Sequence, residues 1–295
     1  MCYALIHDSI DELWHEALEM TLDGQEVAPR GQTCFEVRGA SLVLMDPTKN
    51  ILRAPARKLS YHFLIAEWLW ILNGLDDVET IAAYNKRITN YSDDGKTFFG
   101  AYGPRFLRDL RHVVALLKRD PDSRQAVINI WRPEGLWQTT KDVPCTLTWQ
   151  FFVRSGKLEM IASMRSNDVW LGMPYDIFNF TQIQRYLASA LGVGVGPYQH
   201  NVGSLHLYET NEAAAAAQLL EPVANTLTSP EPIFPCPAQV GGILQGLPRR
   251  MFGTEAAFQM LTVVSPTWQE YGSVLIHRFT QERSDLSHYF QELMT

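Results

Sequence analysis

Residues 144–176 read PCTLTWQFFVRSGKLEMIASMRSNDVWLGMPYD, and this stretch decides how the rest of the chain is interpreted. Its first part is rich in β-branched and aromatic residues on both sides of Ser155-Gly156, which favours two strands, 146–154 and 158–164, joined by a tight turn. Cys145 immediately precedes the first strand, and a strand end can present a thiol to a cleft. A nucleophilic thiolate also needs nearby cations, which arginines could provide.

Hydrophobic periodicity predicts the other elements. We expect helices at residues 8–22, 59–72, 106–118, 177–191, 212–220 and 282–293, and further strands at 34–45, 126–131, 202–208 and 272–280. Residues 222–250 are rich in proline and glycine and predict an extended excursion. Because helices and strands do not alternate in a βαβ rhythm, we expect an α+β fold, with a single large domain over residues 1–295 around a mixed β-sheet flanked by helices.

Composition narrows the class of function. The net charge of −7 over 295 residues argues against a protein that binds duplex nucleic acid, although a local arginine cluster could still bind one phosphate. The first residues lack the basic segment and apolar run of a signal peptide, and no stretch is apolar enough to span a membrane. The four cysteines are scattered, without metal-ligand spacing. We therefore expect a reduced, cytoplasmic protein without a metal site.

Three basic positions could together form an anion site. They are Arg30 in a Pro-Arg-Gly loop, Arg124 after a turn, and Arg165 with Ser166 after the strand 158–164. Guanidinium groups and a hydroxyl match the oxygens of a phosphate. Taken singly, an arginine is more often a solvated surface charge than an anion ligand, and a lone cysteine is more often a small buried hydrophobic residue than a nucleophile.

Several motifs occur together in one order. They are Pro144-Cys145, Gln150, Arg165-Ser166-x-Asp168-x-x-Leu171-Gly172-x-Pro174-Tyr175-Asp176 and His206-x-Tyr208, preceded by Glu67 in a Glu-Trp-Leu-Trp segment, Tyr102-Gly103 and Ser123-Arg124. In these residues the chain resembles the thymidylate synthase family, and especially its cytidylate (dCMP or CMP) 5-hydroxymethylase branch. The resemblance runs from residue 8 to residue 208 and is weak beyond, where the C-terminal tail is unlike the family's.

The resemblance implies a homodimer that binds a pyrimidine nucleoside monophosphate. By this resemblance, Cys145 attacks C6 of the pyrimidine and so makes C5 nucleophilic. The 5′-phosphate is held by Arg30, Arg165, Ser166 and, from the partner subunit, Arg124. The sugar 3′-hydroxyl is bound by His206 and Tyr208, and Gln150 is a further substrate-binding residue.

The resemblance also implies a folate co-substrate, 5,10-methylenetetrahydrofolate, and no metal. The implied folate contacts are Asp168, Leu171, Gly172 and Glu67. Glu67 organises water and moves protons, and Tyr102 assists proton removal at C5. Each position has a structural alternative, because a buried carboxylate in an apolar helix or a packed tyrosine needs no catalytic role.

Asp176 stands where thymidylate synthases have asparagine. An amide can donate to O4 of uracil and accept from its N3–H, whereas a carboxylate only accepts. Cytosine offers a 4-amino donor, so Asp176 favours cytidylate, with ribose or deoxyribose. Protonation of N3 by the same carboxylate also makes C6 more electrophilic, which gives Asp176 a catalytic role. The alternative is that Asp176 turns away and the base is uracil.

The fate of the one-carbon unit leaves two products open. Synthases exclude water with a tryptophan near the ring and a closed tail. Residues 87–99 contain no tryptophan, which favours hydration to a 5-hydroxymethyl group over reduction to a methyl group with release of dihydrofolate. A homologue that binds nucleotide or RNA without catalysis is an alternative of another class, and retention of Cys145, Glu67 and Asp168 together argues against it.

Overall fold

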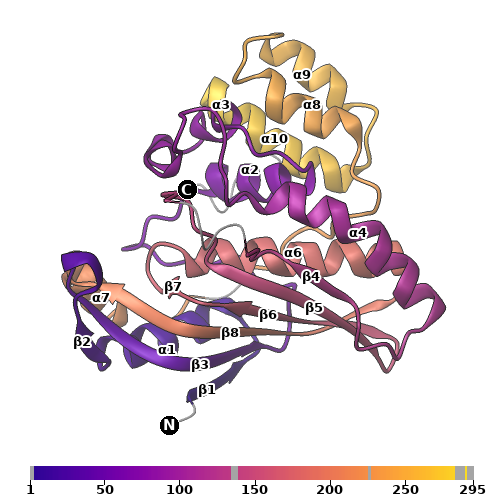
Figure 1. Cartoon of the computed structure of the whole chain (residues 1–295). Coiled ribbons are helices and arrows are strands. Elements are labelled where there is room, and N and C mark those ends of the chain that lie inside the picture. Colours follow the sequence, from indigo (N-terminus) through magenta and orange to yellow (C-terminus); the bar gives the residue numbers. More distant parts are fainter. Residues whose placement is uncertain (1–2, 134–138, 225–226, 283–289, 291–295) are drawn as a thin grey trace. The chain divides into compact units, whose positions relative to one another are not determined.

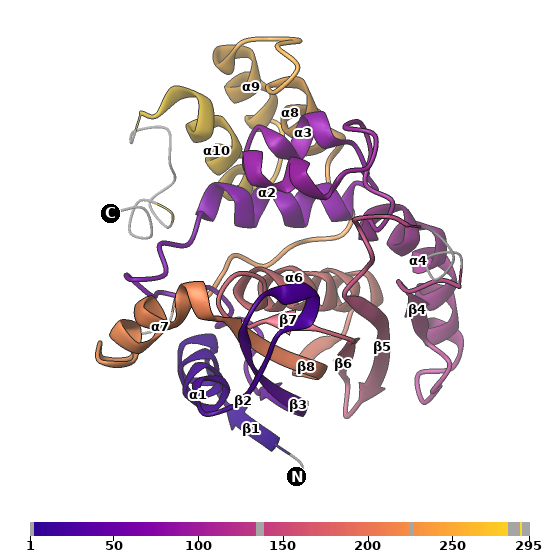
Figure 2. The same cartoon turned by 60° about the vertical axis from the view of Figure 1, so that its left-hand side comes forward.

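The computed structural model describes residues 3–133, 139–224, 227–282 and 290 (Figure 1). The strands form one eight-stranded sheet in the order β1-β3-β8-β6-β5-β4, with β2 paired to β3 and β7 paired to β8 (Figure 2). Their bounds are Tyr3–His7, Gln25–Val27, Cys34–Leu44, Val127–Asn129, Thr146–Arg154, Lys157–Met164, Asn167–Asp168 and Gly194–Tyr208 for β1 to β8. Parallel pairs (β1 with β3, β6 and β7 with β8) and antiparallel pairs are both present, so the predicted mixed sheet is confirmed.

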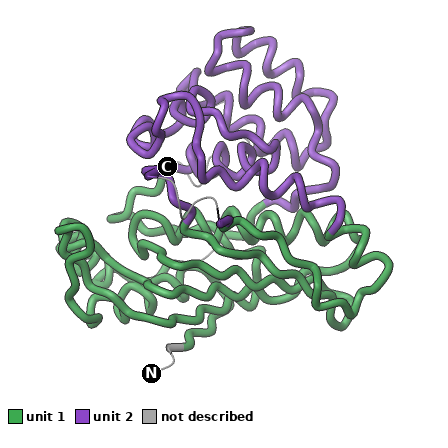
Figure 3. Tube along the Cα trace, in the orientation of Figure 1, with its two compact units in different colours: residues 1–59, 113–131, 145–229 green, residues 60–112, 132–144, 230–295 purple. Residues whose placement is uncertain are grey.

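Two compact units share the chain and alternate along it (Figure 3). The first unit comprises residues 1–59, 113–131 and 145–229 and contains the sheet; the second comprises residues 60–112, 132–144 and 230–295. Each unit therefore combines segments that are distant in sequence. A single domain over residues 1–295 stays a prediction.

One face of the sheet is the core of the first unit. A row of laterally paired residues crosses four strands, Leu42, His200, Ala162 and Trp149, and all four are buried. Helix α6 (Met173–Leu191) packs on β6 and β8, and its Phe180 ring lies 5.0 Å from that of Trp149. Residues pointing to the other face, such as Gln199, are mostly half-exposed.

Two further helices complete the first unit. Helix α1 (Ile10–Leu22) begins at Ser9, whose hydroxyl accepts a hydrogen bond from the Glu12 backbone N–H, as expected of an N-cap. It packs on β1, β3 and α7 (Glu212–Leu219). The loop after β2 contains the short helix η1 (Pro29–Gly31), where Arg30 has a φ of 56°.

The second unit is helical in its described part. It contains α2 (Tyr61–Leu72), α3 (Val78–Ala82), η2 (Lys86–Tyr91), α8 (Ala238–Gly246), α9 (Thr254–Leu261) and α10 (Pro266–Thr280). Trp68 of α2 stacks on Trp268 of α10 with ring centroids 5.7 Å apart and planes at 2°. Helix α4 (Tyr102–Arg119) contributes its first residues to this unit and the rest to the first.

Two expectations for the C-terminal region need correction. The strand predicted at 272–280 is wrong, because these residues form the second half of α10, which Pro266 begins at its first turn. The excursion predicted at 222–250 ends earlier, since α8 begins at Ala238. The helix predicted at 282–293 falls almost entirely outside the described residues.

Within the part of the chain that the structure describes, every helix is too short or too polar to cross a membrane. The same residues contain no group of three or more histidine, cysteine, aspartate or glutamate side chains placed to hold a metal ion.

Candidate active site

The hairpin of β5 and β6 places the thiol beside a guanidinium. Ser155 and Gly156 both have positive φ, 50° and 72°, as a two-residue type I′ turn requires. At the opposite end of the hairpin Thr146 pairs with Met164, so Cys145 and Arg165 are neighbours just beyond the pair. The Arg165 backbone N–H donates to the Cys145 carbonyl at 2.8 Å. The register of the hairpin therefore brings the two residues together.

Their side chains also meet. The Arg165 Nη2 atom lies 3.6 Å from Cys145 Sγ, and the guanidinium carbon lies 5.8 Å from the centre of the Trp131 ring. Cys145 is a half-buried thiol outside any disulfide. A fixed cation beside sulfur stabilises the thiolate, which is the nucleophilic form. The arrangement can therefore support attack by Cys145 on an electrophilic carbon.

The short strand β7 brings Ser166 to the sugar-binding residues expected from the sequence. Asp168 pairs with His206 in the parallel β7–β8 ladder. The Ser166 Oγ atom lies 3.4 Å from His206 Nδ1, and the rings of His206 and Tyr208 meet edge to face at 5.1 Å. These hydroxyl and imidazole groups can bind adjacent oxygens of one ligand.

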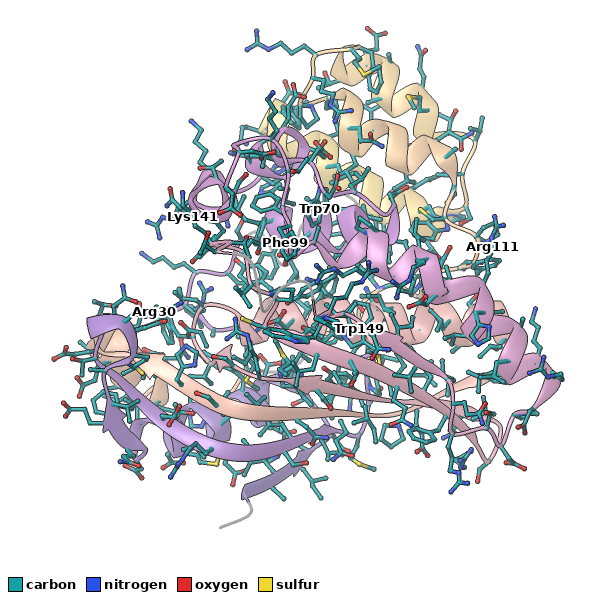
Figure 4. The ribbon with its side chains drawn as sticks, viewed as in Figure 1. Arg30, Trp70, Phe99, Arg111, Lys141 and Trp149 are labelled. Carbon is teal, nitrogen blue, oxygen red and sulfur yellow. The ribbon has the colours of Figure 1, made fainter. Side chains whose placement is uncertain are left out.

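Arg30 lies at the same end of the sheet. It belongs to the loop between β2 and β3, and Cys34, the first residue of β3, pairs with Tyr208 (Figure 4). Its side chain is exposed. The structure thus gives Arg30 a place near the end of β8, with a side chain accessible to an anion.

The two carboxylate oxygens of Asp168 differ: one accepts hydrogen bonds from the backbone, and the other has none among the described residues. Its Oδ1 atom accepts from the backbone N–H groups of Trp170 and Leu171, both at 2.8 Å, which holds the turn before α6. Its Oδ2 atom is buried and has no hydrogen-bond partner among the described residues. Burial raises the pKa of Asp168, partly opposed by these backbone N–H groups and by the charges of His206 and Arg57. A buried acceptor of this kind can receive a hydrogen bond from a donor on a ligand.

Asp176 lies in the first turn of α6, where the partial positive charge of a helix N-terminus favours a carboxylate. Its Oδ2 atom accepts from Asn167 Nδ2 at 2.7 Å. Gly172 precedes the helix, and a Cβ atom there would lie 3.2 Å from Asn167 Nδ2 and 3.4 Å from Asp176 Oδ2. The missing side chain of Gly172 therefore leaves room for this hydrogen bond. Leu171 beside it is 44% exposed, so it offers an apolar surface to a ligand.

Gln150 and Arg124 lie together, at a different part of the sheet. The Gln150 Nε2 atom donates to the Arg124 carbonyl at 2.9 Å, on the face opposite to buried Trp149 and Phe151. Arg124 is exposed and borders a surface hollow with Asp120, Asp122, Ser123 and Gln125. Their expected contacts with substrate stay predictions.

Glu67 and Tyr102 belong to the second unit. Glu67 is half-buried in the middle of α2, among otherwise buried residues, and Tyr102 is the half-buried first residue of α4. Gly103 follows because a Cβ atom at that position would come within 2.9 Å of the Leu75 carbonyl oxygen. The catalytic roles expected for both residues stay predictions.

The sequence analysis missed Arg57 and Asn167, which contact predicted site residues. Arg57 donates to the carbonyls of Trp170 and Leu171 and lies over the rings of Trp170 and Tyr175, at 5.9 and 5.7 Å. Asn167 contacts Asp176, and behind it lie His200 and Tyr198. Arg57 lies in a loop without a motif, and Asn167 occupies the unspecified position of Arg-Ser-x-Asp. No local pattern in the sequence indicates either contact.

Comparison with known proteins adds independent findings. A family model described as thymidylate synthase matches residues 24–229, more than half of the chain. Similar phage proteins, each called deoxyuridylate hydroxymethyltransferase, come from Bacillus phage SP01 (34% identical over 219 residues, 68% of this chain and 57% of that protein), Pseudomonas phage M6 (35% over 199 residues, 64% and 56%) and Delftia phage PhiW-14 (31% over 191 residues, 60% and 54%). The chain spans little more than half the length of these relatives.

Proposed function

Because the chain belongs to the thymidylate synthase family, we propose that it transfers a one-carbon unit from 5,10-methylenetetrahydrofolate to C5 of a pyrimidine nucleoside monophosphate. The observation that carries this proposal is the 3.6 Å contact between Cys145 Sγ and the Arg165 guanidinium. The thiolate adds to C6, and the electron pair displaced by this addition makes C5 the nucleophile. Glu67 and Tyr102 are the proposed groups for moving the C5 proton.

The nucleotide is held through its phosphate and its sugar. Arg30, Arg165 and Ser166 are the proposed phosphate ligands, since guanidinium forks match phosphate oxygens. His206 and Tyr208 are the proposed ligands of the 3′-hydroxyl. Their support is the contact of Ser166, a proposed phosphate ligand, with His206, a proposed sugar ligand. Gln150, and Arg124 from a partner subunit, keep the roles expected from the sequence.

The folate site is proposed at Asp168, Leu171 and Gly172. The buried Oδ2 atom of Asp168, without a partner among the described residues, fits the N–H donors of a pterin ring. Exposed Leu171 can pack on an apolar part of the same ligand. When bound, the folate supplies the one-carbon unit at the oxidation level of formaldehyde. Asp168 orients it, and Arg57 keeps the supporting turn in place.

The proposed product is the 5-hydroxymethyl nucleotide. Two observations favour water over hydride in the last step: the relatives are called hydroxymethyltransferases, and residues 87–99 contain no tryptophan to shield the ring. Hydroxymethylation returns tetrahydrofolate, whereas reductive methylation returns dihydrofolate. Turnover should therefore proceed without the absorbance of dihydrofolate, and its appearance in step with product would establish the reductive alternative.

The proposed base is cytosine, in a ribo- or deoxyribonucleotide. Asn167 already donates to one oxygen of Asp176, so the carboxylate is set up as an acceptor that suits the 4-amino group of cytosine. Facing O4 of uracil, it would leave buried acceptors unpaired at a cost of about 1–3 kcal/mol. Deoxyuridylate is the second candidate, because the relatives are named for it.

Release of tritium from C5 tests both catalysis and base. The protein is incubated with 5,10-methylenetetrahydrofolate and with [5-³H]-labelled dCMP, CMP or dUMP, and we expect release from a cytidylate in preference to dUMP. Asp176→Asn should move the preference toward dUMP. Asp11→Asn is the matched control, because Asp11 is likewise a carboxylate in the first turn of a helix and accepts from a backbone N–H.

Each outcome of this assay decides between named alternatives. A preference of the wild-type protein for dUMP would show that the substrate is deoxyuridylate, the second candidate, and not a cytidylate. Binding of nucleotide without release from any labelled substrate would support the non-catalytic binding protein.

A further inference from the structure

Behind Asp176 a chain of three side chains runs into the core of the first unit. The Tyr198 hydroxyl lies 2.6 Å from His200 Nδ1, His200 Nε2 lies 2.9 Å from Asn167 Oδ1, and Asn167 Nδ2 lies 2.7 Å from Asp176 Oδ2. Tyr198 and His200 are fully buried and Asn167 is 3% exposed. Four polar side chains are thus linked in one line that ends at the proposed base-reading carboxylate.

The fold explains why these residues meet. Tyr198 and His200 alternate along β8 and both point to its buried face. Asn167 begins β7, which pairs with β8, and Asp176 lies in the first turn of α6, which packs on that face. The Phe180 ring of α6 lies 6.2 Å from the His200 ring and closes the space around it. The line therefore joins β8, β7 and α6.

The protonation states of His200 and Tyr198 constrain the direction of the line, that is, which group donates in each hydrogen bond. Burial lowers the pKa of His200 to about 3, so the ring is neutral and carries one N–H. Burial and the nearby Asp176 raise the pKa of Tyr198 well above its usual value, so the phenol keeps its proton. If Tyr198 donates to Nδ1, the proton of His200 is on Nε2 and donates to Asn167 Oδ1. Asn167 then presents its N–H₂ group to Asp176, and every link joins a donor to an acceptor.

The opposite direction gives Asp176 a different partner. With the proton on Nδ1, His200 Nε2 accepts from the Asn167 amide, whose carbonyl then faces Asp176. Two acceptors would face each other unless Asp176 were the neutral acid, whose O–H can donate. The direction of the line therefore determines whether Asp176 accepts from Asn167 as a carboxylate or must donate to it as the neutral acid.

We propose that Tyr198, His200 and Asn167 are positioning residues that hold Asp176 as a hydrogen-bond acceptor and so make the site select a pyrimidine with an amino donor at C4. The inference rests on the proposed function in one respect, the reading of the base by Asp176. Loss of the Tyr198 hydroxyl frees the His200 proton to occupy either nitrogen. The amide of Asn167 can then turn its carbonyl toward Asp176, which repels the carboxylate, so Asp176 is no longer held as an acceptor for the 4-amino group of cytosine.

Two variants and a matched control test the inference. Tyr198→Phe removes the first donor with little change in shape, and Asn167→Leu removes the direct partner of Asp176. Thr181→Val is the control: Thr181 is also fully buried, on α6, and accepts from Asn50 at 2.8 Å, but its hydrogen bonds lead away from Asp176. Calorimetry gives the dissociation constants of dCMP and dUMP for each protein.

We expect the preference for dCMP over dUMP to fall by about tenfold or more in Tyr198→Phe and Asn167→Leu, the factor that one mispaired buried group implies. Thr181→Val should lose stability but keep the wild-type preference. An unchanged preference in both folded variants, or an equal loss in the control, overturns the inference. Where Asn167→Leu fails to fold, Tyr198→Phe decides alone.

The tautomer of His200 gives a readout that is independent of any nucleotide. In protein labelled with ¹⁵N at its eight histidines, long-range proton–nitrogen correlation distinguishes Nδ1–H from Nε2–H, and His200→Asn identifies the signal. We expect Nε2–H in the wild-type protein and a mixture in Tyr198→Phe; Nδ1–H in the wild-type protein overturns the inference. Absence of tritium release with normal dCMP binding contradicts the proposed catalysis instead, and leaves both readouts intact.

Discussion

The three described cysteines differ in what surrounds each sulfur. Burial raises the pKa of Cys34, and it raises the pKa of Cys236 to about 12. Cys145 is half-buried and has the Arg165 guanidinium at 3.6 Å. We therefore predict that iodoacetamide at neutral pH modifies Cys145 before Cys34 and Cys236, as read by peptide mass spectrometry, because only the thiolate reacts.

Arg165→Leu should slow the modification of Cys145 by about tenfold, since the cation no longer stabilises the thiolate. Arg154→Leu is the control, because Arg154 is an arginine at the far end of β5 whose side chain is 38% exposed. Equal rates in the wild-type protein and Arg165→Leu would show that the contact does not activate the sulfur.

Asp168 gives a prediction about pH. Burial raises its pKa in the folded protein above that of the unfolded chain, so the folded state binds the proton more tightly. Its contribution to stability is therefore full below the unfolded pKa and is lost as pH rises through the raised pKa, at up to about 1.4 kcal/mol per pH unit. Asparagine cannot ionise, and its oxygen can still accept from Trp170 and Leu171.

In thermal unfolding, the stability of Asp168→Asn should therefore increase relative to that of the wild-type protein as pH rises from about 4 to about 7. Asp122→Asn, at a side chain that is 95% exposed, should show no such trend. A difference between Asp168→Asn and wild type that stays constant with pH would contradict the raised pKa.

At the scale of elements, β8 supports the hairpin of β5 and β6 through a glycine. A Cβ atom on Gly203 would lie 2.9 Å from the Arg165 carbonyl oxygen, which accepts from the Ser204 N–H at 3.1 Å. Gly203→Ala should therefore displace Arg165, lower stability by about 1–3 kcal/mol and slow the alkylation of Cys145. Gly253→Ala, where a Cβ atom meets nothing within 4 Å, should leave both quantities unchanged.

The hairpin was the most predictable element, because β-branched and aromatic residues on both sides of a Ser-Gly turn indicate both strands and the turn that joins them. The predicted strand at 202–208 lacks the first eight residues of β8, which begins at Gly194. Gly196 and Pro197 weaken the strand pattern in this part. Tyr198 and His200, which lie in that missed part, were consequently absent from the predicted site. The contact of His200 with Asn167 joins residues 33 apart in the sequence, which no local pattern encodes.

The strand predicted at 272–280 failed for another reason. Taken alone, these residues are rich in β-branched and apolar side chains. Read from Pro266, however, Trp268, Tyr271 and Leu275 recur at helical spacing, and all three are buried in α10. The window that began at residue 272 left out Pro266 and Trp268, so the helical spacing was not visible in it. The same Trp268 stacks on α2, so a helix beyond the family match packs against the helix that carries Glu67.

At the scale of the whole molecule, Arg124 provides a test of assembly. It is exposed before β4, and its carbonyl already accepts from Gln150. We predict a homodimer in which each subunit gives Arg124 to the partner's phosphate site, as a two-fold axis would require of both copies. Cys145→Ala and Arg124→Ala proteins should each be impaired alone. In a mixed dimer, the subunit that keeps Cys145 would receive Arg124 from the other.

Co-expression of the two variants with different affinity tags isolates these mixed dimers. Random pairing should restore about a quarter of the wild-type turnover in the unfractionated mixture, because half of the dimers are mixed and each has one complete site. Tagged mixed dimers that remain as inactive as the parents would contradict donation in trans. Full activity of Arg124→Ala alone would show that Arg124 does not act at the phosphate site. A monomeric wild-type protein in sedimentation analysis would contradict the homodimer.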